Sequence, residues 1–116
     1  MKFTDFKNAI LAPFDSLQSE SGEEFLELMV DTIDVYGEKD EKLTSLFGWE
    51  YSLSRSRHWD KEQENHIMFD GFTDEHLADL YDTILDLETD IDKIVLNVDG
   101  MNDLDEPIHK EIIVEF

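Results

Sequence analysis

The sequence contains no cysteine, which excludes disulfides and thiol chemistry. Proline is nearly absent, with two residues, and we find no Pro- or Ser-rich linker and no internal repeat. The N-terminal segment lacks a long apolar run, because Lys2, Asp5 and Lys7 interrupt it, so neither a signal peptide nor a transmembrane segment is predicted. We therefore expect one domain over residues 1–116, located in the cytoplasm.

Basic residues are scarce: 9 Lys and Arg stand against 30 Asp and Glu, which gives a formal net charge of −21. Such a field opposes binding to DNA, RNA and anionic membranes. It favours basic protein surfaces, which are common where nucleic acid binds. A hydrophobic content of 41% with eight Phe indicates a folded globule and not a disordered acidic tail.

The stretch Thr73–Asp92 has the pattern of an amphipathic helix and contains no Lys or Arg. Thr73 suits the N-cap position, and Phe72 and Leu77 have the spacing of a hydrophobic staple. Apolar residues at helical spacing predict one buried face: Leu77, Leu80, Tyr81, Ile84 and Leu85. The opposite face carries a row of carboxylates: Glu75, Asp79, Asp82 and Asp86.

A second acidic helix is predicted over Ser21–Tyr36, where Ser21 and Glu24 match a capping box and Gly37 follows as a C′ glycine. Its buried stripe would consist of Phe25, Leu28, Met29, Thr32, Ile33 and Tyr36. Its outer face would carry Glu20, Glu24, Glu27, Asp31 and Asp34. Surface helices usually mix charge signs, because like charges at i and i+4 destabilise. Two rows of one sign therefore suggest a partner or an adaptation that favours them.

The remaining segments predict an α+β fold. Residues 4–19 predict a helix that breaks or kinks near Pro13. Alternation from Leu46 through Leu53 predicts a strand that extends to Trp59 and returns across a polar loop as residues 66–69. Residues 93–98 and 112–116 predict a second hairpin. The expected order is ααββαββ, with N-terminal helices and an antiparallel sheet packed by helices.

No catalytic, cofactor or metal signature is present, so we expect neither an enzyme nor a cofactor. His58 and His66 flank the first hairpin and could in principle bind zinc with Asp60 or Asp70. No HExxH or paired CxxC supports such a site, so we expect ordinary hairpin histidines. The acidic loop of residues 97–106 lacks the EF-hand frame, which leaves weak divalent-ion binding as an alternative.

One basic cluster interrupts the acidic sequence, at residues 55–59, with Arg55 and Arg57 next to His58 and Trp59. Such a cluster can bind a nucleic-acid strand where aromatic residues accompany it. In a field of −21, we expect the arginines to neutralise neighbouring carboxylates or to make one bidentate contact with a partner.

These observations favour a non-enzymatic inhibitor that mimics nucleic acid and blocks the basic groove of a DNA- or RNA-binding or nuclease protein. The candidate partner-binding residues are Glu20, Glu24, Glu27, Asp31, Asp34, Glu75, Asp79, Asp82, Asp86, Asp103 and Asp105. In size, acidity and lack of catalytic motifs the chain resembles phage-encoded anti-restriction and anti-CRISPR proteins, a resemblance of composition that transfers no residue roles. Two alternatives are an immunity protein that neutralises a basic nuclease toxin and a structural or adaptor module with a salt-adapted acidic surface.

Overall fold

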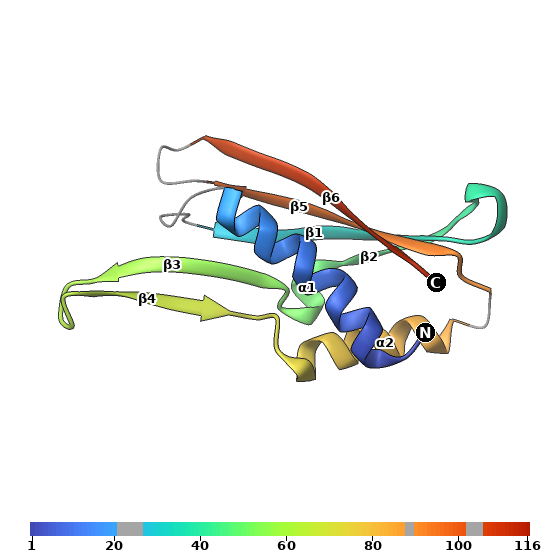
Figure 1. Cartoon of the computed structure of the whole chain (residues 1–116), viewed down its shortest axis with the longest axis horizontal. Helices are drawn as coiled ribbons and strands as arrows, with labels where there is room; N and C mark the ends of the chain where they lie inside the picture. The colour runs from blue at the N-terminus through green and yellow to red at the C-terminus, as the bar shows by residue number, and fades with distance from the viewer. Residues whose placement is uncertain (21–26, 88–89, 102–105) are drawn as a thin grey trace.

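The computed structural model describes residues 1–20, 27–87, 90–101 and 106–116. For residues 17–20, 57–59, 66 and 68 it describes the backbone and not the side chains. Within these residues, two helices and a six-stranded antiparallel sheet form an α+β fold (Figure 1). The elements are α1 (Phe3–Glu20), β1 (Glu27–Tyr36), β2 (Lys42–Phe47), β3 (Ser54–Asp60), β4 (Asn65–Asp70), α2 (Asp74–Asp86), β5 (Lys93–Met101) and β6 (Pro107–Glu115), with 3-10 turns η1 (Glu38–Asp40) and η2 (Gly48–Tyr51). The predicted α+β class is confirmed, with one N-terminal helix in place of two.

The central strand β1 lies in the segment for which a second helix was predicted. That prediction is wrong from Glu27 onward, and residues 21–26 lie outside the described residues. The predicted helical stripe did not include Val30 and Val35, whereas both are buried in the strand. A bulge near Asp31 shifts the alternation by one residue, so the period of two is hidden in the sequence.

The sheet has the strand order β4-β3-β1-β5-β6, and β2 also pairs with β1. The two halves of one β1 edge pair with different strands: β3 at residues 27–29 and β2 at residues 32–36. Figure 1 shows the β3–β4 hairpin as an arm on one side of β1, with β5 and β6 on the other.

The turn η2 separates β2 from β3 and replaces the predicted strand around Trp49. It packs closely on β1, since a Cβ added at Gly48 would lie 1.9 Å from the carbonyl oxygen of Val30. Only glycine fits at that distance. Gly37, predicted to follow a helix, instead lies between β1 and η1 with an extended backbone.

Helix α2 begins as predicted, because the Thr73 hydroxyl accepts a hydrogen bond from the His76 backbone N–H at 3.2 Å. It ends at Asp86, earlier than expected, and Leu85, assigned to the buried face, is 57% exposed. Helix α1 is continuous through Pro13, where a break or a kink was predicted. Pro13 is exposed, while Phe14 and the preceding turns anchor the helix in the core.

Both helices pack on one face of the sheet. Their buried side chains share one hydrophobic core with the inward residues of β1, β5 and β6, which include Leu28, Ile33, Leu96 and Val114. The outward side chains of the sheet alternate with these, and no described helix covers them. Neither α1 nor α2, the helices that the structure describes, is long and apolar enough to cross a membrane.

Candidate partner-binding surfaces

The carboxylates predicted on α2 lie on its exposed face: Glu75, Asp79, Asp82 and Asp86, here called the α2 acidic row. At about 1.5 Å of rise per residue the row extends for about 16 Å along the helix axis. Among the described residues, none of its four side chains forms an ion pair with Lys or Arg. Lys7 of α1 pairs at 2.5 Å with Asp74 of α2, which lies outside the row.

The carboxylates predicted on a second helix do not form a helical row, because β1 is a strand. Glu27 and Asp31 are exposed on the outer face of the sheet. Glu24, Asp103 and Asp105 lie outside the described residues, and so does the side chain of Glu20.

Asp34 makes contacts that join β1 to β2 and β5. Its carboxylate accepts hydrogen bonds from the Ser45 hydroxyl at 2.7 Å and the Asn97 amide at 3.1 Å, and the Lys42 ammonium lies 3.2 Å away. Burial alone would raise the pKa of Asp34, but Ser45, Asn97 and Lys42 together hold it below its ordinary value. Asp34 is thus a stabilising link across the sheet.

The α2 acidic row and the β1 carboxylates face away from each other. Leu28 and Val30 of β1 share the core with Leu77 and Leu80 of α2, so the exposed side of each element points away from the other. One continuous acidic face across both elements is therefore not formed by the described residues.

The outer face of the sheet has an apolar hollow that the sequence patterns did not reveal. It encloses about 310 Å³ where β1, η2 and the β3–β4 hairpin meet, and we call it the outer-face hollow. Its lining includes Met29, Trp49 and Phe69, which are 39%, 73% and 49% exposed. Met29 was predicted to lie in the buried stripe of a helix, and Trp49 in a strand. The predicted α+β fold could have indicated an exposed apolar face, because helices that pack on one face of a sheet leave the other face uncovered.

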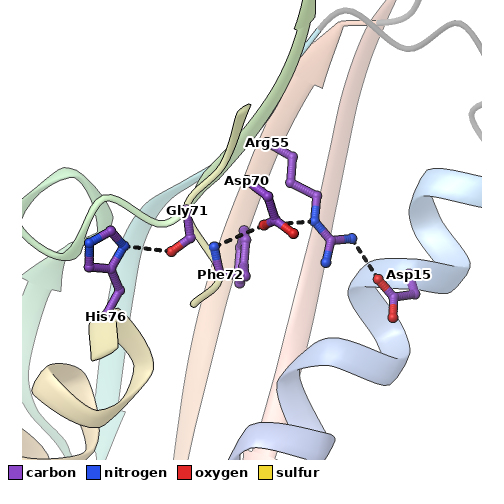
Figure 2. Close-up of polar contacts among 6 residues, drawn as sticks. All are labelled: Asp15, Arg55, Asp70, Gly71, Phe72 and His76. Carbon is purple, nitrogen blue, oxygen red and sulfur yellow. Dashed lines mark hydrogen bonds and ion pairs between the residues drawn. The ribbon is translucent and has the colours of Figure 1, made fainter. Parts of the chain in front are cut away.

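The Arg55 side chain fastens the β3–β4 hairpin to α1 (Figure 2). Its guanidinium lies 2.5 Å from Asp15 Oδ1 and 3.0 Å from Asp70 Oδ1, and it stacks over the rings of Phe14 and Phe72 at 5.0 and 5.6 Å. Burial alone would lower the pKa of Arg55, but Asp15 and Asp70 raise it above its ordinary value. Arg55 neutralises carboxylates, as we expected, and at 9% exposure it is not available to a nucleic acid.

Two further hydrogen bonds connect the end of β4 to the start of α2 (Figure 2). Asp70 Oδ1 accepts the Phe72 backbone N–H at 2.9 Å, and the His76 Nδ1–H donates to the Gly71 carbonyl at 2.7 Å. A Cβ added at Gly71 would lie 1.8 Å from the carbonyl oxygen of Ser52, next to the outer-face hollow. The position of the outer-face hollow therefore depends on the contacts that Arg55 makes with Asp15 and Asp70.

The histidines considered as zinc ligands are not cross-strand partners. The register of β3 and β4 pairs His58 with Ile67 and Trp59 with His66. Within the part of the chain that the structure describes, no group of three or more His, Asp and Glu side chains is placed to hold a metal ion.

Comparisons of this chain with protein-family models, with curated proteins and with solved structures found no match. Function is therefore inferred from the residues and their geometry.

Proposed function

We propose that the chain is a non-enzymatic binding protein that mimics nucleic acid and blocks the basic groove of a nucleic-acid-binding or nuclease protein. The α2 acidic row carries this proposal: four exposed carboxylates follow one helix face, on a helix without Lys or Arg. Neighbouring like charges on a helix destabilise it by about 0.2–0.5 kcal/mol per pair. Cations of a basic partner would offset that repulsion in the complex.

The dimensions of the row suit one wall of a phosphate-binding groove. Phosphates along one strand of a duplex rise by about 3.4 Å, so about 16 Å corresponds to about five of them. Four carboxylates over that length have a slightly lower charge density than a nucleic-acid strand. The formal net charge of −21 would accelerate association with a basic surface and would make the rate fall as salt rises.

An immunity protein would use the same row to bind a basic nuclease toxin. The identity of the partner distinguishes this function from inhibition of a defence enzyme. A salt-adapted adaptor module needs no particular row, because its charge would act only through solubility.

The test compares two variants that remove the same number of charges. One neutralises the α2 acidic row by Glu75→Gln, Asp79→Asn, Asp82→Asn and Asp86→Asn. The control neutralises exposed carboxylates in other turns by Glu38→Gln, Glu41→Gln, Glu62→Gln and Glu64→Gln. Each protein is immobilised and used to capture a partner from cell lysate at low and high salt, and the affinity for the identified partner is measured.

We expect the row variant to lose affinity by about 30-fold, since each of its four lost charge pairs contributes about 0.5 kcal/mol. The control variant should stay within about twofold, and duplex DNA should displace the protein from its partner. Undiminished binding by the row variant, or simultaneous binding of DNA and this protein to the partner, would refute the proposal.

A further inference from the structure

The outer-face hollow forms where η2 connects β2 to β3 and packs on β1. The strand β2 ends at Phe47, η2 turns above Val30, and β3 begins at Ser54, so Trp49 projects beside Met29. Phe69 of β4 completes the apolar lining, and Phe47 stacks on Trp49 with ring centroids 6.3 Å apart. Three segments distant in sequence thus expose their large apolar side chains at one place.

The size of the hollow suits one inserted side chain. Pockets for small-molecule ligands have volumes of about 300–1,000 Å³, and 310 Å³ lies at the lower limit. Tryptophan and methionine are frequent at protein interfaces, where tryptophan often contributes a large share of the binding energy and methionine adapts to the partner's shape. An apolar anchor from another protein is therefore a better match than a metabolite.

The surroundings of the hollow are acidic. Asp31 lines it, and a second hollow of about 230 Å³, which shares Met29, is bordered by Glu27 and Asp99. No Lys or Arg lines either hollow among the described residues. A second copy of this chain is a poor occupant, because two surfaces of a protein with net charge −21 repel each other.

We propose that the outer-face hollow binds a basic segment of a partner protein, with one aromatic or long apolar side chain inserted beside Met29, Trp49 and Phe69. Lysine or arginine residues that flank this anchor face Asp31, Glu27 and Asp99. The site lies on the side of the sheet opposite to the core that holds α2, so it acts independently of the α2 acidic row.

The test uses a short synthetic peptide of alternating Lys and Arg around one central Trp. One control peptide replaces the Trp by Ala, and another keeps the Trp but replaces the basic residues by Asp and Glu. Binding to the full chain is measured by NMR titration of backbone amides and of the Trp49 indole N–H, which is identified by its loss in Trp49→Phe.

Four protein variants locate the binding. Met29→Ser combined with Phe69→Ser removes apolar lining at two exposed positions, and Asp31→Lys reverses one charge. Ile113→Ser is the matched control, because Ile113 is 53% exposed on β6 and does not line the hollow. The neutralised α2 acidic row is the second control and separates this proposal from the proposed function. Unchanged amide shifts in β5 away from the hollow report that each variant is folded.

We expect the basic Trp peptide to shift the amides of residues 29, 52 and 54 and the Trp49 indole. The Ala peptide, the acidic peptide and the Met29/Phe69 variant should each weaken binding by at least about tenfold. Asp31→Lys should weaken the basic peptide and strengthen the acidic one, while both control variants stay within about twofold. The proposal fails if no binding occurs, if the Ala peptide binds equally well, if shifts concentrate on α2, or if Ile113→Ser matches the Met29/Phe69 variant.

Discussion

Replacing Arg55 by Met tests whether its guanidinium holds the β3–β4 hairpin against α1. Methionine retains an apolar stem between Phe14 and Phe72 but loses the charge that contacts Asp15 and Asp70. Breaking a fully buried ion pair costs about 3–5 kcal/mol, because the remaining charge is left without solvent. Here the side chains of Asp15 and Asp70 are 60% and 45% exposed, so water can solvate them after the substitution.

The expected loss is therefore smaller than for a fully buried pair. A hydrogen bond to a charged group contributes about 1.5–3 kcal/mol and a cation–π contact about 0.5–2 kcal/mol. Methionine recovers part of the packing, so we expect Arg55→Met to lower the free energy of unfolding by about 2 kcal/mol. Arg55→Ala should cost about 3–4 kcal/mol, because it also removes the buried stem.

Urea unfolding at 25 °C, followed by circular dichroism, measures both variants against Lys61→Met. Lys61 is exposed in the β3–β4 turn, so this control removes the same charge without the buried contacts. A loss for Arg55→Met within about 0.5 kcal/mol of the Lys61→Met value would refute the account. Because Ser54 and Phe69 adjoin Arg55 and Asp70 and line the outer-face hollow, Arg55→Met should also weaken the basic Trp peptide.

Three further predictions concern charge and packing. Asp34→Asn should lower the free energy of unfolding by about 1–2 kcal/mol at pH 7; since the folded-state pKa of Asp34 is lowered, this loss should shrink as pH falls below about 4, the ordinary pKa of Asp. Asp31→Asn, on the same strand, should change stability little, and equal effects of the two substitutions in urea unfolding would contradict the Asp34 contacts. Gly48→Ala should cost about 3 kcal/mol or more in thermal or urea unfolding, because its Cβ meets backbone, whereas Gly37→Ala meets mainly a leucine side chain at 3.2 Å and should cost less. Neutralising the three aspartates of the α2 acidic row should stabilise the protein by about 1 kcal/mol at low salt and by much less in 1 M salt, and a gain that does not depend on salt would exclude relief of repulsion.

The local signals of α2 were sufficient to predict it. A cap at Thr73, acids in the first turn and apolar residues at helical spacing all belong to one short segment, and the structure places the carboxylate row on the exposed face. The first hairpin turn near residues 60–65 was predicted for the same reason, because turn residues separate two short strands.

The segment of β1 was mistaken for a helix because its apolar residues fit two periods. The choice between the periods depends on strands far along the chain, since Val30 pairs with Val98 and Leu28 with both Arg55 and Gly100. The bulge near Asp31 then obscured the alternation. The carboxylates of the predicted second row therefore do not lie together. Asp34 contacts neighbouring strands, and Glu27 and Asp31 lie on the outer face of the sheet.

The sequence by itself determined the α+β class, the negative field and the α2 acidic row, because composition and a single amphipathic segment are local properties. Only the tertiary structure decided that Met29, Trp49 and Phe69 meet on an uncovered sheet face, and that Arg55 is buried between two carboxylates and two aromatic rings. These groups come from separate strands and turns. Their meeting depends on strand register and on the close approach at Gly48, which no single segment encodes.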